Sequence, residues 1–436
     1  MSAILFEILT AYAFVWATIN VYNIYPLLRH NVEVNLKRRR AKYELPDKLP
    51  TISILIPAYH EENVLEFTIK SIFNADYPRK LIDVIILTER DDTGTFQVVK
   101  RLMEKYGVRH VHVEESEEPR GKPRALNAGL KHVKGEIIGV IDAEDIIDHR
   151  LFKEVVAMLS SNLDAVQGVL DMTNDRDGFK NMHLRAEYRY WYKTVIPAII
   201  YSDFPVPLGG TTNFFKRSVL HELKGWDPYN LTEDFDLGLR LYNEHKKVGA
   251  IYDMLKERES RSMFHNKYEL GIMRSRTKEE SPITWMGWLK QRTRWQRGKI
   301  QTMKKVVKKP PSGVKRKAHS VMASLIPHLG PINLTGIAFS AYAFFSGMFM
   351  PFWLSYIFYF NMFMVVFYAV MQGKSYFDVV HKNRKHRLRN AMFVGITTPI
   401  YWVFQWIADL RAIKQEYVDK QIFWEKTEHF GTNIKK

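Results

Sequence analysis

Carboxylates follow three hydrophobic runs of the chain, at the points where buried strands would end. They are Glu61 after the first run, Glu89 and Asp91 after the second, and Asp142 with Glu144 after the third. Alternate carboxylates in a tight turn supply the oxygen ligands that Mg²⁺ and Mn²⁺ prefer. Such a cation neutralises charge that builds on a departing phosphate. The alternative for each cluster is loop solvation or helix capping without chemistry.

A second acidic motif begins a predicted helix near the middle of the chain. The segment LTEDFDL (231–237) precedes an amphipathic pattern, with Thr232 in the N-cap position. A carboxylate in the first turn is favoured by the helix dipole. Asp234, with Glu233 beside it, is therefore a candidate general base that accepts a proton from an incoming hydroxyl. Capping alone is the alternative here.

The segment QRTRW (291–295) lies on a further predicted helix. Gln291, Arg294 and Trp295 are spaced i, i+3 and i+4, so they share one helix face. An amide, a guanidinium and an indole together suit a sugar acceptor and a phosphate, because arginine binds phosphate through two parallel hydrogen bonds. Other tryptophans and basic residues nearby also suit an amphipathic helix at a membrane surface without chemistry.

Strands that alternate with helices must position these groups. Buried runs at 52–56, 82–88 and 137–141 alternate with helical patterns, which predicts an α/β domain with a mostly parallel sheet. Ligands bind at the carboxyl ends of strands in such sheets, so the three acidic clusters are expected at one edge. Neither GxGxxG nor GxxxxGK[ST] occurs, which argues against a dinucleotide oxidoreductase and a P-loop NTPase.

Composition narrows the class of protein further. The 436 residues are 46% hydrophobic, which excludes global disorder. The absence of cysteine excludes disulfides, thiolate nucleophiles and cysteine-type zinc sites. The net charge of +17 is concentrated in runs rich in Lys and Arg, at 30–42, 299–317 and 372–390. Because these runs lie beside long uncharged stretches, they indicate membrane topology with basic loops inside rather than a nucleic-acid-binding face.

Three uncharged stretches are candidates for contact with the bilayer. Segment 8–28 is long enough for one crossing of a ~30 Å hydrocarbon core, and 318–373 is long enough for a hairpin. Segment 391–408 contains Pro399 and favours a kinked or interfacial helix. The predicted organisation is a transmembrane helix, a cytosolic catalytic domain, interfacial helices with QRTRW, a transmembrane hairpin, and a kinked or interfacial helix with a tail, at 1–29, 45–270, 271–317, 318–373 and 391–436.

Together these motifs resemble the processive, membrane-integrated family-2 glycosyltransferases, the group that contains cellulose, hyaluronan and chitin synthases. The resemblance covers about residues 50–300 and the tail. PAYHE (57–61) is similar to the nucleotide-binding opening of the family, with His60 where asparagine is usual. KPRALN (122–127) resembles the motif behind the diphosphate. Asp142-Ala-Glu144 stands where the family has D-x-D, and Thr232-Glu-Asp234 stands where it has T-E-D.

The resemblance assigns roles to particular side chains. It implies Asp234 as the general base, with Glu233 beside it, and Mg²⁺ or Mn²⁺ on Asp142 and Glu144. It implies that the donor contacts come from Tyr59, Glu61, Glu89, Asp91, Lys122, Asp142, Gln291, Arg294 and Trp295. FWEKTEH (423–429) resembles the gating loop that covers the cytosolic site, which favours three crossings over four. A histidine could complete the metal site, the candidates being His110, His112 and His265.

The resemblance implies a Rossmann-like glycosyltransferase domain of type A at the cytosolic face of the plasma membrane. The expected reaction is inverting, metal-dependent transfer of a hexose from GDP-mannose or UDP-glucose to a growing β-linked polysaccharide. One alternative is transfer of a single sugar to a polyprenyl phosphate or another lipid acceptor. The other is a lipid-binding membrane scaffold without catalysis. The donor sugar, the linkage, the product length and the oligomeric state stay open.

Overall fold

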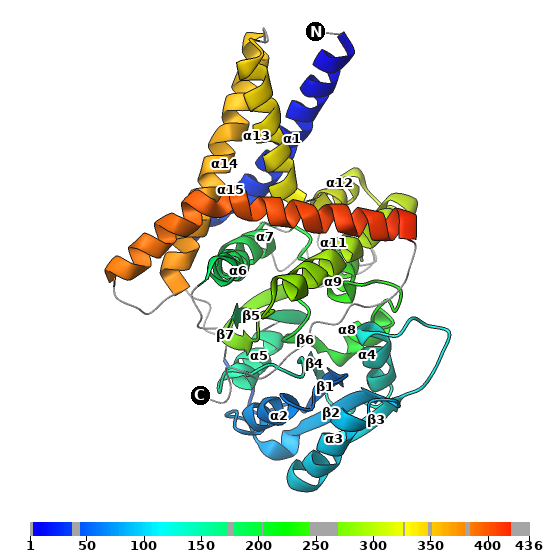
Figure 1. The fold of residues 1–436 in the computed structure, drawn as a ribbon. Coiled ribbons are helices and arrows are strands. Elements are labelled where there is room, and N and C mark those ends of the chain that lie inside the picture. Colours follow the sequence, from blue (N-terminus) through cyan, green and yellow to red (C-terminus); the bar gives the residue numbers. More distant parts are fainter. Residues whose placement is uncertain are drawn as a thin grey trace, which may run out of the picture.

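A sheet domain lies beneath a group of long helices in the computed structural model (Figure 1). The structure describes residues 3–36, 44–161, 163–172, 178–202, 204–244, 269–325, 328–347, 351–379 and 384–419. The expected gating loop at 423–429 and His265 lie outside the described residues. The α11 helix (Trp285–Lys308) lies between the sheet domain and the long helices. It carries the QRTRW segment into the space between the two parts.

The sheet has seven strands in the order β3-β2-β1-β4-β6-β5-β7. The strands are β1 (Ile52–Ala58), β2 (Ile82–Glu89), β3 (Arg109–Val113), β4 (Ile137–Val140), β5 (Ala165–Met172), β6 (Asn213–Lys216) and β7 (Leu270–Glu279). β1 pairs in parallel with β2 and β4, β2 pairs in parallel with β3, and β5 pairs in parallel with β7. Only β6 is antiparallel to its neighbours. The predicted mostly parallel α/β sheet is confirmed.

Helices cover both faces of the sheet because side chains alternate between the faces along each strand. Ile52, Ile54 and Ile56 pack with α2 (Leu65–Phe73), α3 (Thr93–Tyr106) and α5 (Leu151–Ser160). Leu55 belongs to the core on the other face. The helices of that face are α4 (Lys122–Leu130), α6 (Phe179–Tyr190), α7 (Ile196–Tyr201), α8 (Arg217–Glu222) and α9 (Glu233–Asn243). β1 is therefore apolar almost throughout, as a strand buried on both faces must be.

Shorter helical elements connect these parts. A 3₁₀ turn, η1 (Arg79–Leu81), precedes β2, and α12 (Val314–Leu325) follows α11. A five-residue π-helix, η2 (Trp191–Val195), joins α6 to α7. A second π-helix, η5 (Gln415–Asp419), ends the last long helix. Short π-helical segments occur frequently at functional sites, so η2 and its aromatic side chains are relevant to the cavity described below.

The long helices divide into an upright group and one crossing helix. α1 (Ala3–Leu36), α13 (Leu329–Phe345) and α14 (Phe352–Val379) contact one another side by side. Trp16 of α1 donates a 2.7 Å hydrogen bond from Nε1 to Oδ1 of Asn333 on α13. α15 (Arg384–Lys414) runs across the ends of this group that face the sheet domain (Figure 1).

Within the described part of the chain, two helical segments are long and apolar enough to cross a membrane by length and composition, Phe352–Asp378 and Arg384–Asp419. Ile332–Phe345 is a shorter apolar helix. The second candidate includes α15, which lies transverse to α14 in the structure. Length and composition therefore do not decide its orientation. The expected crossing within 1–29 lies inside α1 and stays a prediction.

Two expected segment boundaries are wrong in the structure. Residues 271–279 are part of β7 rather than of interfacial helices, because alternate residues such as Met273 and Thr277 are buried while the intervening residues are more exposed. The uncharged stretch at 318–373 also includes the end of α12, so α13 and α14 form the hairpin only from Leu329 onward. α13 ends at Phe345 and α14 begins at Phe352, so the two helices are connected between these residues.

Candidate active site

A cavity of about 620 Å³ begins at the carboxyl ends of β1, β2 and β4 and continues to the long helices. Most of the predicted donor and catalytic residues line it. They are Tyr59, Glu61, Glu89, Lys122, Asp142, Glu144, Glu233, Asp234, Gln291, Arg294 and Trp295. Asp91 does not line the cavity. Much of the remaining wall comes from α6, η2 and the long helices, none of which was predicted to form part of the site.

Arginine–carboxylate pairs hold together the side of the cavity at the ends of β1 and β2. Nη2 of Arg124 donates to both carboxylate oxygens of Glu89 at 2.7 and 2.8 Å, and both residues are buried. Arg120 pairs with the exposed Asp91, and its guanidinium lies 4.5 Å from the centre of the Tyr59 ring. A flat stack of this kind suits the base of a nucleotide at the cavity entrance.

The loop after β1 has a backbone conformation that explains its unusual residue. His60 has φ of 54°, a left-handed conformation that asparagine, aspartate and histidine adopt more readily than other residues. Its N–H donates to Oδ2 of Asp92 at 2.6 Å, while Oδ1 of Asp92 accepts the 3.1 Å N-cap bond from Thr95. Asp92 is therefore a capping residue. His60, Glu62 and Asp92 place possible ligand atoms within 4.8 Å of one another.

The acids after β4 form a dense negative cluster around Lys122. Nζ of Lys122 bonds to Oδ1 of Asp142 and donates to the carbonyl oxygen of Gly210 at 2.7 Å. The N–H of Asp142 donates to Oγ1 of Thr211 at 2.9 Å, and Oγ1 of Thr211 donates to Asp145. The Gly209–Asn213 loop therefore fixes the position of Asp142.

This cluster has the chemistry that a divalent cation requires. Burial, together with the charges of Glu144 and Asp142, raises the pKa of Asp145 well above its ordinary value. Asp142 and Glu144 both line the cavity and present only oxygen donors. An excess of carboxylates that share one wall fits Mg²⁺ or Mn²⁺, whose charge would relieve their repulsion. The residues present therefore fit the predicted ion.

The predicted extra histidine ligands lie elsewhere. Nε2 of His110 is 2.8 Å from Oγ1 of Thr88, and the rings of His110 and His112 pack against Phe96. Neither histidine lines the cavity. Burial lowers the pKa of His110 to about 4, with His112 adding to the effect. These two side chains are part of the packing between β3 and α3.

Asp234 and Lys122 converge on the same backbone position from different elements. A Cβ placed on Gly210 would lie 3.6 Å from Oδ2 of Asp234 and 3.7 Å from Nζ of Lys122. Oδ1 of Asp234 accepts a 2.8 Å bond from the N–H of Phe235, in the first turn of α9. Glycine at position 210 leaves room between the two side chains for a ligand.

Electrostatics differ between the neighbouring carboxylates of α9. Burial, and then the charge of Asp234, raises the pKa of Glu233 to about 8. Burial also raises the pKa of Asp234, but Lys122, Arg294 and the N–H of Phe235 oppose the rise. Burial alone would lower the pKa of Lys122, but Asp142 and Glu233 raise it. Lys122 therefore stays charged, and its charge favours an ionised Asp234.

Close packing holds α11 against the start of α9. A Cβ on Gly298 would lie 2.4 Å from Oγ1 and 2.6 Å from the backbone nitrogen of Thr232, so no side chain fits at this position. Thr232 is the N-cap residue as expected, but the expected capping bond is absent. Its hydroxyl instead donates to Oδ1 of Asn230 at 3.3 Å. This contact fixes QRTRW relative to Asp234.

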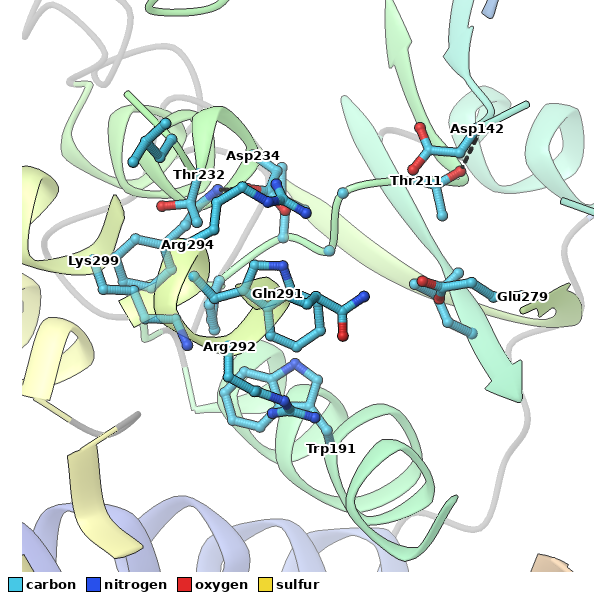
Figure 2. A pocket seen from close by; sticks show the side chains of 18 of the residues that line it. Asp142, Trp191, Thr211, Thr232, Asp234, Glu279, Gln291, Arg292, Arg294 and Lys299 are labelled. Atoms are coloured by element: carbon cyan, nitrogen blue, oxygen red, sulfur yellow. Dashed lines mark hydrogen bonds between the residues drawn. The ribbon is translucent and has the colours of Figure 1, made fainter. Parts of the chain in front are cut away.

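The α11 helix presents different side chains to two parts of the cavity. Figure 2 shows Asp234 and Arg294 on one side of Gln291, with Arg292 and Trp191 on the other side. Gln291 is buried, and its Oε1 has no hydrogen-bond partner among the described residues. An unpartnered amide oxygen that lines a cavity indicates a ligand that donates hydrogen bonds, such as a sugar hydroxyl.

Several cavity residues were missed by the sequence analysis. Arg292 lies within QRTRW and Lys299 lies beyond it on α11, Trp191 lies on η2, and Glu279 ends β7. Lys299 follows Gln291 and Trp295 at i+8 and i+4, so helical spacing alone could have placed it on their face. Glu279 could have been found by the strand-end rule once residues 270–279 were recognised as a strand.

The strand order, the acids at the strand ends and the aspartate at the start of α9 define a type-A glycosyltransferase. Residues 50–298 match the model described as "Glycosyltransferase like family 2", which is more than half of the chain. The chain therefore belongs to glycosyltransferase family 2. The predicted resemblance at the level of the family is confirmed.

Curated relatives differ in the acceptor that their names state. The chain is 28% identical over 255 residues to the "Probable glycosyltransferase YdaM" of Bacillus subtilis, and the match covers 58% of this chain and 56% of that protein. It is 26% identical over 245 residues to a "Beta-monoglucosyldiacylglycerol synthase" of Nostoc sp., covering 54% and 51%. The chain thus spans about half the length of these two relatives. A "Poly-beta-1,6-N-acetyl-D-glucosamine synthase" of Staphylococcus epidermidis is 24% identical over 364 residues, covering 81% and 80%.

A solved structure has the same fold over nearly the whole chain. It is the "Mannosyltransferase PcManGT from Pyrobaculum calidifontis in complex with GDP-Man and Mn2+". The TM-score is 0.56 and the identity is 16%, and the match covers 95% of this chain and 100% of that one. At this identity the likeness establishes the fold, which here includes the sheet domain and helices outside it.

Proposed function

We propose that the chain is an inverting, metal-dependent hexosyltransferase that uses a nucleotide diphosphate sugar. The observation that carries the proposal is the convergence of Lys122 and Asp234 beside Gly210 in one cavity. One of these groups suits the diphosphate of a donor and the other suits the hydroxyl of an acceptor. A reaction that joins the two substrates needs both groups in the same cavity.

The donor occupies the end of the cavity formed by the strand ends. Tyr59 and Glu89 lie near the base and ribose, and Lys122 with Arg294 contacts the diphosphate. Asp142 and Glu144 hold Mg²⁺ or Mn²⁺, which when bound neutralises charge on the leaving diphosphate. The solved mannosyltransferase with the same fold is in complex with GDP-Man and Mn²⁺, which supports GDP-mannose as a donor and a divalent cation in this site. GDP-mannose and UDP-glucose are the proposed donors.

Asp234 acts as the general base. As the acceptor hydroxyl attacks the anomeric carbon, its proton passes to the carboxylate of Asp234, and the bond from that carbon to the diphosphate oxygen breaks. Attack from the face opposite the diphosphate inverts the configuration and gives a β-linkage from an α-linked donor. Arg294 stabilises the negative charge that develops on the leaving group. No covalent intermediate on the protein is required.

The acceptor enters from the helical side of the cavity. α1, α13, α14 and α15 all contribute to the cavity wall, so an acceptor at the bilayer could reach Asp234 without crossing bulk water. We propose that α1, α13 and α14 cross the plasma membrane, that α15 lies at its surface, and that the sheet domain is cytosolic. A growing polysaccharide is the acceptor expected from the sequence. A lipid acceptor is the alternative, and the names of the relatives include both kinds.

Replacement of the base tests this proposal. Asp234→Asn keeps the shape of the side chain but removes the proton acceptor, so transfer should fall by about 10³-fold, near the middle of the range for general-base catalysis. Affinity for the donor, measured by calorimetry with Mn²⁺ present, should stay within about twofold. Glu66→Asn, on the distant α2 helix, is the control for surface charge. Normal transfer by Asp234→Asn would overturn the assignment of the base.

A further inference from the structure

The cavity has two cations at its helical end that neither the donor site nor the motif assignments use. Arg292 and Lys299 both lie on α11 and line the cavity. The wall that faces them comes from α1, α13, α14 and α15. Its lining residues in the described part of the chain are uncharged, among them Asn23, Asn333 and Gln405. Glu187 of α6 pairs with Arg292, so the charge of Lys299 is left as an excess of positive charge at this end of the cavity.

Arg292 has unused hydrogen-bonding capacity in this space. Its residue is 7% exposed, and Nη1 donates to Oε1 of Glu187 at 2.5 Å. Nε and Nη2 have no hydrogen-bond partner among the described residues. The guanidinium lies 4.6 Å from the ring centre of Trp295, which keeps it flat and fixed. Buried N–H groups without an acceptor are costly, and this pair of donors matches two oxygens of one oxyanion.

Lys299 adds charge without a carboxylate of its own. No hydrogen bond or ion pair to its Nζ is present in the described part of the chain. Burial, and then the charge of Arg292, lowers the pKa of Lys299 to about 8, which indicates that its charge is poorly compensated. The charge of Asp409 on α15 acts against this lowering of the pKa, and Oδ2 of Asp409 lies 3.1 Å from Nδ1 of His328.

We propose that Arg292 and Lys299 bind a phosphate group of the acceptor, so that the acceptor is a phosphate-bearing amphiphile whose sugar hydroxyl reaches Asp234. This inference rests on the proposed function and names the acceptor class for that reaction. The charged oxygens of a phosphate can accept hydrogen bonds from Nε and Nη2 of Arg292 and pair with the ammonium group of Lys299. A neutral polysaccharide has no charged oxygens. The diphosphate of the donor has its own partners in Lys122 and Arg294. The wall formed by α1, α13, α14 and α15 reaches the proposed bilayer, so the lipid part of the acceptor can stay in the bilayer.

A matched pair of acceptors tests the inference on the full chain. One is an alkyl β-glucoside and the other is a glucose 1-(alkyl phosphate) with the same alkyl chain. Nucleotide release and product mass give KM and kcat for each. The phosphate-bearing probe should have a KM lower by about tenfold, because hydrogen bonds to charged groups contribute on this scale. Inorganic phosphate is tested as a competitor, and weak inhibition is expected because the lipid part contributes to binding.

Variants of α11 separate this site from the donor site. Lys299→Gln should raise the KM of the phosphate-bearing probe by about tenfold and remove most of the difference between the two probes, whereas Lys299→Arg should restore it. The Kd of the nucleotide sugar should stay within about twofold in both. Lys308→Gln, an exposed lysine on the same helix, is the matched control and should behave like the wild type.

Failure of this inference is distinguishable from failure of the proposed function. If the wild type hydrolyses the nucleotide sugar but uses both probes with equal KM, the phosphate site is wrong and the transferase proposal stands. The same holds if Lys299→Gln weakens both probes equally, since that indicates a general role in packing. If inorganic phosphate alone competes as well as the phosphate-bearing probe, the site binds free phosphate rather than the acceptor. If no donor is bound at all, the proposed function itself fails.

Discussion

The two ends of the cavity are built on different principles. At the strand ends, charges are matched by local partners: Lys122 pairs with Asp142, and Arg124 pairs with Glu89. At the helical end, Arg292 pairs with Glu187, but in the described part of the chain Lys299 has no such partner and the wall formed by α1, α13, α14 and α15 carries no charge. A matched site can hold a charged donor together with its metal ion, whereas an unmatched site needs a charged group from the ligand. The difference supports the proposal that the strand-end side binds the donor and that the helical side binds an anionic acceptor.

Removal of the arginine between the two ends should have the largest effect among the variants that sharpen this comparison. Arg294→Gln loses a cation that stabilises the leaving diphosphate, so kcat should fall by about 10²- to 10³-fold, as for other donors to developing negative charge. Nucleotide release at saturating donor measures it. The exposed Lys290 of the same helix serves as control, and Lys290→Gln should retain full activity. If Arg294→Gln changed only the KM of the acceptor, Arg294 would belong to the acceptor end of the cavity rather than to the donor end.

A change in the packing between α11 and α9 should have the second-largest effect on kcat. Gly298→Ala places a methyl group 2.4 Å from Oγ1 of Thr232, so α11 must move away from α9. Overpacking of this kind costs about 1–3 kcal/mol, and a displacement near 1 Å of positioned groups reduces kcat by about 10²-fold. Thermal unfolding and steady-state kinetics measure both effects. At Gly178 no atom of the described residues lies within 4 Å of a new Cβ, so Gly178→Ala should leave kcat unchanged.

The strand-end residues were predictable because their signals are local. Asp142 follows a buried run directly, and Asp234 occupies the first turn of an amphipathic helix, so a short window of sequence is enough to find each. β7 was not predicted, because it pairs with β5 across more than a hundred residues and carries charges on its exposed positions. Helical spacing was enough to place Lys299 on the face of Gln291 and Trp295, but its charged surroundings include Glu187 of α6 and Asp409 of α15, which no local pattern brings to it.

The dependence of activity on pH should test the two ends of the cavity separately. The decrease in acid depends on Asp234, and the decrease in alkali depends on Lys299. A raised pKa of Asp234 means that the carboxylate takes up a proton at a higher pH than usual, so kcat/KM should fall as pH decreases through that value. The groups that face Lys299 are Arg292, Glu187, Asp409 and Asp234. With a pKa of about 8, Lys299 loses its charge above that pH, and the KM of the phosphate-bearing probe should rise by up to about tenfold.

The matched control for the alkaline limb is Lys299→Arg, which stays charged and should have a flat KM up to pH 9. The neutral alkyl glucoside should show no alkaline rise with either protein. Equal alkaline behaviour of the two probes in the wild type would indicate that the charge of Lys299 does not act on the acceptor.

The smallest effect concerns the contact between α11 and the end of α15. Glu416 accepts bonds from Arg297 at 2.9 Å, Gln301 at 3.2 Å and Lys304 at 2.8 Å. Glu416→Gln should reduce the free energy of unfolding by about 2 kcal/mol, because charged hydrogen bonds in a mostly buried position are lost. The exposed Glu66–Lys105 pair is the control, and Glu66→Gln should cost below about 1 kcal/mol.

The sign of the pH dependence checks the same contact. Burial raises the pKa of Glu416, but the bonds from Lys304 and Arg297 outweigh burial and lower it. A lowered pKa in the folded state means that this contribution is present above the ordinary value of 4.5 and is lost as pH falls below it. The stability difference between wild type and Glu416→Gln should therefore shrink in acid. A constant difference across pH would show that the contact acts by packing alone.

The central claim, transfer from a nucleotide sugar at this cavity, is tested most directly by turnover of the full chain in lipid nanodiscs. A panel of UDP- and GDP-hexoses is supplied with Mg²⁺, with Mn²⁺ or with a chelator, and the nucleotide released and the mass of the product are measured. We expect that the nucleotide is released from one donor only when the metal ion is present, and that a β-linked hexose is attached to an acceptor in the same reaction. A single added sugar on a lipid and a ladder of sugars would distinguish the two acceptor classes. Absence of both binding and turnover with every donor, metal present, would contradict the claim.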